Sequence, residues 1–314
     1  MTAAQQTTST LLMVPPVHFA FNEQTGEDNS FQQHLDLKTQ EIRTLAMAEF
    51  DAMVEKLCAL GVNILTLPVE KDGPKTPDAV FPNNWFSTHD DGELVLYPMA
   101  VENRRMEVQP QRLRQCLTGA GFNIQSVWDC RDNAQDEHYL EGTGAMVLDR
   151  VNGIVYAALS QRCHADVLET FCAHRNLRAE AFDTRMQNSQ SVYHTNVMMA
   201  VGKHFAIICT DVIVPGDQKR VKKAISATHQ IIEISEAQLH AFCGNVLEVQ
   251  NDKGEALILM SSSAFAAFSD EQKAQLEQFG QLVPLDIPTI ETIGGGSVRC
   301  MLAEIFLPQN LTKP

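Results

Sequence analysis

The sequence predicts a closed, quasi-symmetric α/β fold built from about five similar units. Along the chain, segments with the apolar spacing of a helix end at a glycine and lead into a short β-rich run, an order that recurs roughly every 60 residues. Strand-like runs that follow turn sequences lie between these segments, as expected for hairpins. The same order also arises in α/β proteins without symmetry. Since no low-complexity linker divides the chain, a single domain over residues 11–310 is expected.

The predicted elements follow one another in a regular order. Apolar residues from Ile42 to Leu60 recur at helical spacing, and Gly61 ends this helix before the β-rich run 62–67. A second helix precedes Gly121 and leads into 122–124. The remaining helix–strand pairs are 166–175 before 177, 236–242 before 246–249, and 269–279 before 282–285. Hairpin strands are expected at 93–97 and 153–159.

Composition excludes several classes of partner. The 314 residues include 39 acidic and 24 basic side chains, a formal net charge of −15. Such an excess of negative charge disfavours nucleic acid and anionic membrane surfaces. No run approaches the ~20 apolar residues of a membrane-spanning helix, and the polar first ten residues lack a signal-peptide core. We therefore expect a cytoplasmic protein whose residues 1–10 and 311–314 are frayed.

The eight cysteines form neither a disulfide framework nor a zinc site. None lies in a C-x-x-C pair, and the ten histidines contain no H-E-x-x-H sequence. No metal is expected. Any single cysteine is most simply a buried free thiol, because cysteine behaves as a small hydrophobic residue.

Three segments contain residues suited to catalysis. Cys300 follows the run Gly294-Gly295-Gly296, and three consecutive glycines are typical of backbone that closely approaches a ligand. Such a loop can present a nucleophilic thiolate, or it can be a flexible turn before a buried cysteine. His194 adjoins a β-rich run and Glu141 precedes a stretch of small residues, so each is either a catalytic partner or a structural residue.

Taken together, the order Glu-Gly, His-x-Asn and Gly-Gly-Gly-x-x-x-Cys resembles the guanidino-group-modifying enzymes with the pentein fold. The resemblance extends over nearly the whole chain and is greatest to the citrulline utilization hydrolase branch, whose members are often labelled arginine deiminase-related or amidinotransferase-like. It implies a five-bladed α/β propeller with pseudo-fivefold symmetry. Further segments that carry it are 13–16, 22–25, 77–85, 103–108 and 159–162.

The resemblance also implies roles for individual residues. Cys300 would be the nucleophile, His194 the general acid and base, and Glu141 the carboxylate that orients His194. Substrate-binding residues would be Asp78, Asn83, Asn84, Arg104, Arg162 and Asn196. Of these, the two arginines would hold the carboxylate of a small amino-acid substrate, a task suited to the planar guanidinium group. No cofactor is implied, and a homo-oligomer is compatible with the resemblance.

Three departures from the arginine deiminase pattern bear on the substrate. Asn84 and Asn196 replace carboxylates that grip a guanidinium, and Gly144 replaces an aspartate. A carboxamide both donates and accepts hydrogen bonds, which suits a neutral ureido group better than a cation. We therefore expect a hydrolase that converts citrulline to ornithine, ammonia and carbon dioxide. The alternatives are a deiminase or dihydrolase of arginine or an N-modified arginine, an amidinotransferase, and a catalytically silent binding module.

Overall fold

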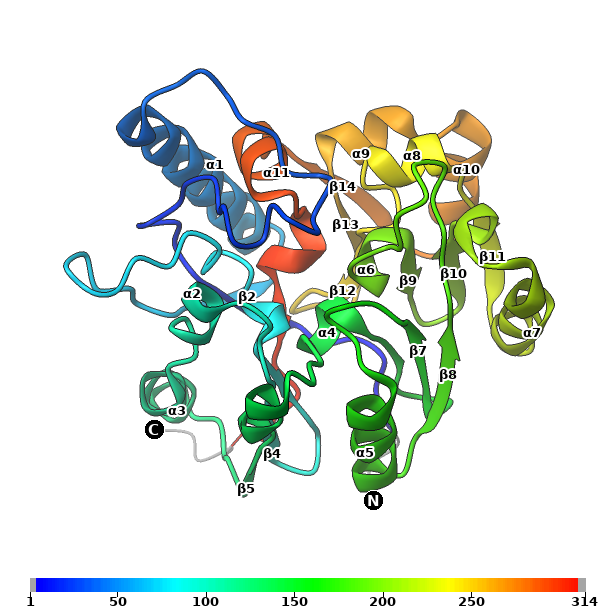
Figure 1. Cartoon of the computed structure of the whole chain (residues 1–314), viewed down its shortest axis with the longest axis horizontal. Helices are drawn as coiled ribbons and strands as arrows, with labels where there is room; N and C mark the ends of the chain where they lie inside the picture. The colour runs from blue at the N-terminus through cyan, green and yellow to red at the C-terminus, as the bar shows by residue number, and fades with distance from the viewer. Residues whose placement is uncertain (1–3, 310–314) are drawn as a thin grey trace.

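The computed structural model describes residues 4–309, in which five three-stranded sheets surround the centre of the molecule (Figure 1). In every sheet the middle strand pairs antiparallel with one neighbour and parallel with the other. The sheets are β15-β1-β2 (Ala303–Glu304, Thr10–Met13, Asn63–Thr66), β3-β4-β5 (Phe86–Thr88, Glu93–Leu96, Ser126–Asp129), β6-β7-β8 (Val147–Asp149, Ile154–Ala158, Arg178–Phe182), β9-β10-β11 (Met199–Val201, Phe205–Ile208, Gln230–Glu233) and β12-β13-β14 (Leu247–Gln250, Ala256–Ser261, Gln281–Leu285). This architecture confirms the predicted α/β propeller of five blades.

Helices connect the two parallel strands of each sheet, and the long ones lie on the outside of the propeller (Figure 1). In sheet order they are α1 (Thr39–Ala59), α2 and α3 (Glu102–Arg105, Pro110–Gly119), α5 (Ala165–Arg175), α7 (Pro215–Ser226), and α9 and α10 (Ser262–Ala267, Asp270–Leu276). Shorter helical segments are α4 (Gly142–Ala145), α6 (Thr195–Met198), α8 (Glu236–His240), α11 (Pro288–Gly294), and the 3-10 turns η1 (Pro82–Asn84), η2 (Arg131–Asp136), η3 (Thr210–Val212) and η4 (Val298–Met301). Within the described residues, no helix is both long and apolar enough to cross a bilayer.

The two ends of the chain close the propeller. Strand β15 pairs with β1, so that Leu11 lies opposite Glu304 and Leu12 opposite Ala303. Just before β1, the buried Gln6 donates to the carbonyl of Leu148 at 2.9 Å. The prediction of a frayed terminus is therefore wrong for residues 6–10, because polar side chains there pair with buried backbone rather than with water. The predicted fraying of 311–314 lies outside the described residues.

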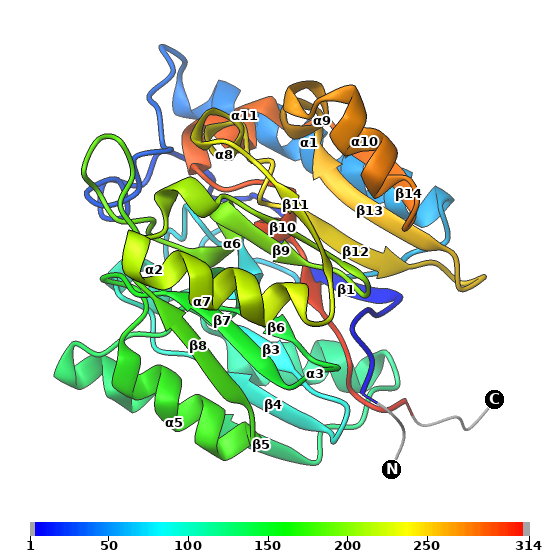
Figure 2. The ribbon, with the colours of Figure 1, turned by 90° about the vertical axis from the view of Figure 1, so that its right-hand side faces the viewer.

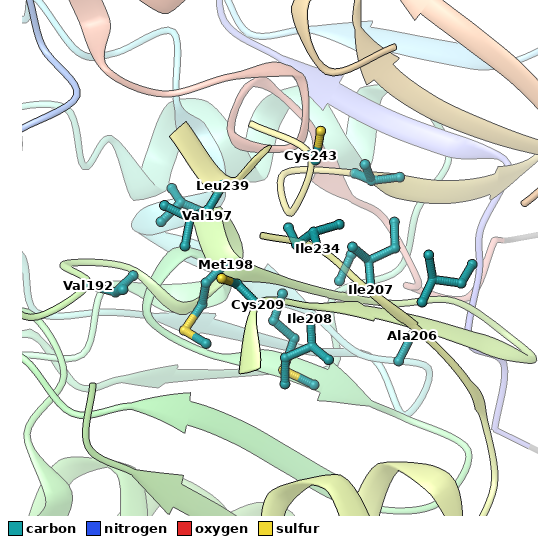
Figure 3. Close-up of a cluster of buried hydrophobic side chains, with 14 of the residues drawn as sticks. Val192, Val197, Met198, Ala206, Ile207, Ile208, Cys209, Ile234, Leu239 and Cys243 are labelled. Carbon is teal, nitrogen blue, oxygen red and sulfur yellow. The ribbon is translucent and has the colours of Figure 1, made fainter. Parts of the chain in front are cut away.

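The middle strands form the core because both of their faces are covered. Strands β4, β7 and β10 are buried throughout. Helix α7 covers the outer face of the β9-β10-β11 sheet (Figure 2). Figure 3 shows the largest apolar cluster, in which residues of β10, α6 and α8 pack together with Cys209 and Cys243. Burial raises the pKa of both thiols to about 12, so these two cysteines are structural.

Most predicted elements are present, with two misplacements. The run 122–124 contributes only one isolated bridge at Phe122, and the strand follows at β5. Segment 236–242 is the short helix α8 between sheets, whereas the helix of the fourth sheet is α7. The apolar period of α7 is weak in the sequence because only Val221 and Ile225 are buried among charged residues.

Candidate active site

Five turns from the five sheets meet at the centre of the propeller. Each turn precedes the first strand of its sheet and carries one residue that is followed by two apolar residues. These five residues are Asn84, Gly144, Asn196, Asn245 and Cys300. Neighbouring turns pack on one another, as α4 does on η1 and α6, and η1 on η4. The pseudo-symmetry of the fold thereby gathers residues that are far apart in the sequence.

Cys300 lies on η4 with only 2% of its surface exposed. Its Sγ atom accepts hydrogen bonds from Asn196 Nδ2 at 3.4 Å and Asn245 Nδ2 at 3.2 Å. The glycine run before it is a packed loop rather than a flexible turn. A β-carbon on Gly294 would lie 2.7 Å from the ring of Phe81, and Gly295 has a φ of +60°.

His194 and Glu141 form a buried pair at 2.8 Å between Nε2 and Oε2. The backbone N–H of Ala100 donates to the other carboxylate oxygen at 3.0 Å, which fixes the plane of Glu141. Burial alone would raise the pKa of Glu141, but the charge of Arg162 and the His194 contact hold it far below its usual range. The carboxylate is therefore ionised and orients the imidazole.

Both predicted substrate arginines are buried and already paired with protein acceptors. Arg104 donates to Glu107 through Nε and Nη2, and through Nη1 to Asn84 Oδ1 at 2.8 Å. Arg162 donates through Nε to Asp28 at 2.8 Å and lies 3.4 Å from Glu141 Oε2. A substrate carboxylate would have to displace one of these carboxylates.

Asp78 lies beside this pair of arginines in a fully buried position. Its Oδ2 atom accepts from Asn22 Nδ2 at 2.7 Å and from Thr25 Oγ1 at 3.0 Å, while Oδ1 has no partner. Burial raises the pKa of Asp78, and the charge of Arg104 lowers it in part.

Unpaired buried polar atoms indicate where a ligand binds. Among the described residues, five buried side-chain N or O atoms lack a hydrogen-bond partner. Four of them belong to predicted substrate-binding residues: Asp78 Oδ1, Asn83 Oδ1, Asn84 Nδ2 and Asn196 Oδ1. Buried polar groups are costly when unpaired, so their concentration here indicates a polar ligand.

All nine predicted site residues are at most 3% exposed, so the site is closed to solvent. Segment 22–33 covers it: Asp28 pairs with Arg162, and Asn29 Nδ2 donates to the carbonyl of Gly295 at 3.2 Å. Such closure excludes water that would otherwise compete for polar groups.

Gly144 leaves the space that the Asn84 side chain occupies. A β-carbon on Gly144 would lie 2.0 Å from Asn84 Nδ2 and 2.9 Å from His194 Nδ1. An aspartate, as in the deiminase pattern, has no room here without displacing both residues. The departure noted in the sequence therefore has a steric cause.

Sequence reasoning missed several residues that hold the site together: Asn22, Thr25, Asp28, Glu107 and Asn245. Asn245 carries a recognisable signal, since it occupies the repeated position before the first strand of a sheet. The other four give no such signal, because their partners are distant in the sequence and only the fold brings them near.

Fold and site together define a pentein of the guanidino-group-modifying class. Residues 15–307 match the model of the family described as N,N dimethylarginine dimethylhydrolase, eukaryotic, and the chain belongs to this family of hydrolases acting on guanidino C–N bonds.

Solved structures with the same fold include ArgZ, an arginine dihydrolase from the ornithine–ammonia cycle in cyanobacteria. Its unliganded form is 16% identical, with a TM-score of 0.72, and the alignment covers 96% of this chain but only 41% of ArgZ. The N-terminal domain of ArgZ bound to its substrate is 16% identical, with a TM-score of 0.70 and coverage of 95% of this chain and 99% of that domain.

A dimethylarginine dimethylaminohydrolase carrying an adduct with S-methyl-L-thiocitrulline is 15% identical, with a TM-score of 0.61. The alignment covers 95% of this chain and 99% of that one. At these identities the likeness concerns the fold. A search of curated proteins finds no sequence match.

Proposed function

We propose that the chain is a cysteine-dependent hydrolase of the ureido group of citrulline, giving ornithine, ammonia and carbon dioxide. Cys300 is the nucleophile, His194 the general acid and base, and Glu141 the group that orients His194. The substrate is a small amino acid, and the reaction needs no cofactor. We place this reaction in the cytoplasm, in keeping with the acidic composition.

The choice of substrate rests on one observation: which of the unpaired buried atoms donate hydrogen bonds and which accept them. Asp78, Asn83 and Asn196 each offer a free acceptor oxygen, whereas Asn84 offers a free N–H donor. Arg104 only donates, so its bond to Asn84 Oδ1 turns the amide nitrogen of Asn84 away from Arg104, toward Gly144 and His194. A ureido group has N–H donors and one carbonyl acceptor, which matches this set. A guanidinium has five donors and no acceptor for Asn84 Nδ2.

The reaction proceeds in two stages. In the first, Sγ of Cys300 adds to the ureido carbon while His194 takes the thiol proton and gives it to the departing nitrogen. In the second, His194 activates a water molecule that releases the carbonyl carbon as a carbamate, which decomposes to carbon dioxide and an amine. One citrulline and one water thus give one ornithine, one ammonia and one carbon dioxide.

We assign Arg104 and Arg162 a positioning role in this reaction, in place of the carboxylate clamp expected from the sequence. The hydrogen bond of Arg104 orients Asn84, and Arg162 keeps Glu141 ionised. Their pairing with Glu107 and Asp28 supports this role.

The second candidate is hydrolysis of arginine or an N-modified arginine, as in ArgZ. The carboxylate of Asp78, whose Oδ1 is unpaired, favours it because a buried cation requires a countercharge. An amidinotransferase would use the same residues with an amine in place of water.

The decisive assay incubates the protein with citrulline, arginine, dimethylarginine and succinylarginine, each with and without an amine acceptor. Ammonia is measured and products are identified by mass spectrometry. Citrulline should be consumed fastest and yield ornithine, and Cys300→Ser should abolish turnover while leaving the Tm unchanged. Release of citrulline from arginine as the main reaction would contradict the proposal.

A further inference from the structure

Asn245 is a fully buried residue in the turn between α8 and β12, and its side chain contacts both catalytic turns. Its Nδ2 atom donates to the carbonyl of Asn196 at 2.8 Å and to Cys300 Sγ at 3.2 Å. Its Oδ1 atom accepts from the backbone N–H of Arg299 at 3.0 Å. One amide thus joins the turn that carries His194 to the turn that carries the nucleophile.

The orientation of this amide is fixed by its partners. The backbone N–H of Arg299 can only donate and the carbonyl of Asn196 can only accept, so exchanging the oxygen and nitrogen of Asn245 would lose both bonds. An N–H group must therefore face Cys300 Sγ. The preceding Gly244 permits the close approach, since a β-carbon there would lie 2.4 Å from the carbonyl of Val197.

The groups that donate hydrogen bonds to Cys300 Sγ are neutral amides. In the described part of the chain, the hydrogen bonds to Sγ come from the amides of Asn196 and Asn245. The neighbouring Arg299 turns away, with Nη1 donating to the carbonyl of Leu302 at 2.8 Å and Nη2 2.9 Å from Glu304.

Tyr193, which precedes His194 in the chain, is a further titratable group near enough for its pKa to be affected by Cys300. Burial raises the pKa of Tyr193 well above its ordinary value, so its hydroxyl stays protonated and donates to the carbonyl of Gly295 at 2.6 Å. Other charged or titratable groups near this turn are His194 with its partner Glu141, Arg162 at 5.3 Å from the Tyr193 ring, and the carboxyl groups of Asp28 and Asp78.

We propose that Asn245 is a positioning residue of the reaction, which holds Sγ of Cys300 by an N–H hydrogen bond and stabilises the thiolate when it forms. This role rests on the proposed function only in that Cys300 is the nucleophile. The pseudo-symmetry supports it independently, because Asn245 occupies the same position in its sheet as Asn84, Asn196 and Cys300 occupy in theirs.

The test measures the thiolate directly by following iodoacetamide alkylation of Cys300 between pH 5 and 10. Peptide mass spectrometry locates the label, because Cys58 is exposed and will also react. The variants are Asn245→Asp, which replaces the N–H facing Sγ by a carboxylate oxygen, and Asn245→Ser. The matched control is Asn251→Asp at the far end of β12, where Oδ1 accepts from the backbone of Lys253 and Glu255.

Asn245→Asp should move the half-point of the alkylation profile upward by about one pH unit or more, because an added negative charge and a lost donor both disfavour the thiolate. At pH 7 the alkylation rate should fall by about tenfold. Asn245→Ser should give a smaller shift in the same direction, and Asn251→Asp none. A change confined to packing would lower the Tm without moving the half-point.

An unchanged half-point in folded Asn245→Asp would overturn the proposal, as would an equal shift in Asn251→Asp. If Asn245→Asp does not fold, Asn245→Ser decides, and wild-type reactivity in that variant overturns the proposal. The alkylation needs no substrate. If no ureido or guanidino compound is turned over, the proposed function is contradicted. The alkylation profiles still decide the role of Asn245 in that case.

Discussion

The imidazole of His194 donates a 2.8 Å hydrogen bond to a carboxylate of Glu141 that has no exposed surface. Burial lowers the pKa of His194 below its ordinary value of 6.5, although the contact with Glu141 raises it in part. The imidazole is therefore neutral at pH 7 and able to accept the thiol proton of Cys300.

Replacing Glu141 with Gln should lower kcat by roughly 10²–10⁴-fold, because the imidazole loses its orientation and the charge that stabilises its protonated form. In the wild type, kcat/KM should fall on the acid side only below pH 6.5, and the variant should shift this limb to lower pH. Measuring kcat/KM from pH 4.5 to 9 checks both effects. The matched control is Glu93→Gln, which breaks the partly exposed pair with His174 and should leave kcat unchanged.

The lowered pKa of His194 also makes the free energy of unfolding depend on pH. The unfolded chain binds a proton at His194 near pH 6.5 and the folded chain only at lower pH, so the free energy of unfolding should decrease as the pH falls below about 6.5. Urea denaturation of wild type and His194→Gln at pH 5 and 7.5 measures this dependence. An equal loss of stability in both proteins would contradict the assigned shift.

Arg104→Lys should lower kcat/KM by about 10–1000-fold, because lysine cannot bind Asn84 and Glu107 together. Comparing citrulline with carbamoylputrescine, which lacks the carboxylate, separates the two roles of this arginine. If Arg104 positions Asn84, both substrates lose activity by the same factor in the variant. A loss confined to citrulline would instead show that Arg104 holds the substrate carboxylate. Arg112→Lys is the control, because the partly exposed Arg112 of α3 pairs with Glu70 and not with Asn84 or Glu107.

The repeated order of helix, glycine and strand predicted a closed, quasi-symmetric α/β fold, because each unit repeats the same local preferences. The five-bladed propeller itself came from the resemblance to the pentein enzymes. The position of β5 was misplaced in the prediction, and helix α7 was missed. The apolar pattern of α7 consists of Val221 and Ile225 alone. At the site, short motifs led to Cys300 and His194 as candidates, and the fold brings their turns together through the hydrogen bond from Asn196 to Cys300. The pairing of Arg162 with Asp28 could not be predicted. These residues are 134 positions apart, and they meet only because segment 22–33 folds over the site.

Gly144→Ala should lower kcat by at least about 100-fold while the fold persists, because its β-carbon would displace both Asn84 and His194. The overpacking should cost about 1–3 kcal/mol in the free energy of unfolding. Gly119→Ala on α3 is the matched control, since nothing lies within 4 Å of its β-carbon. Kinetics and urea denaturation of both variants check the contrast, and full activity in Gly144→Ala would contradict the placement of Asn84 beside His194.

The central claim, that the asparagines of the site suit a neutral ureido group, is tested most directly by calorimetric binding of citrulline and arginine to Cys300→Ser, where no reaction obscures the affinity. Citrulline should bind more tightly. Asn84→Asp with Asn196→Asp in the same background should reverse the preference by about one to three decades, since a nearby countercharge is worth on the order of 1–4 kcal/mol. Tighter binding of arginine than of citrulline by Cys300→Ser alone would contradict the account and favour an arginine hydrolase.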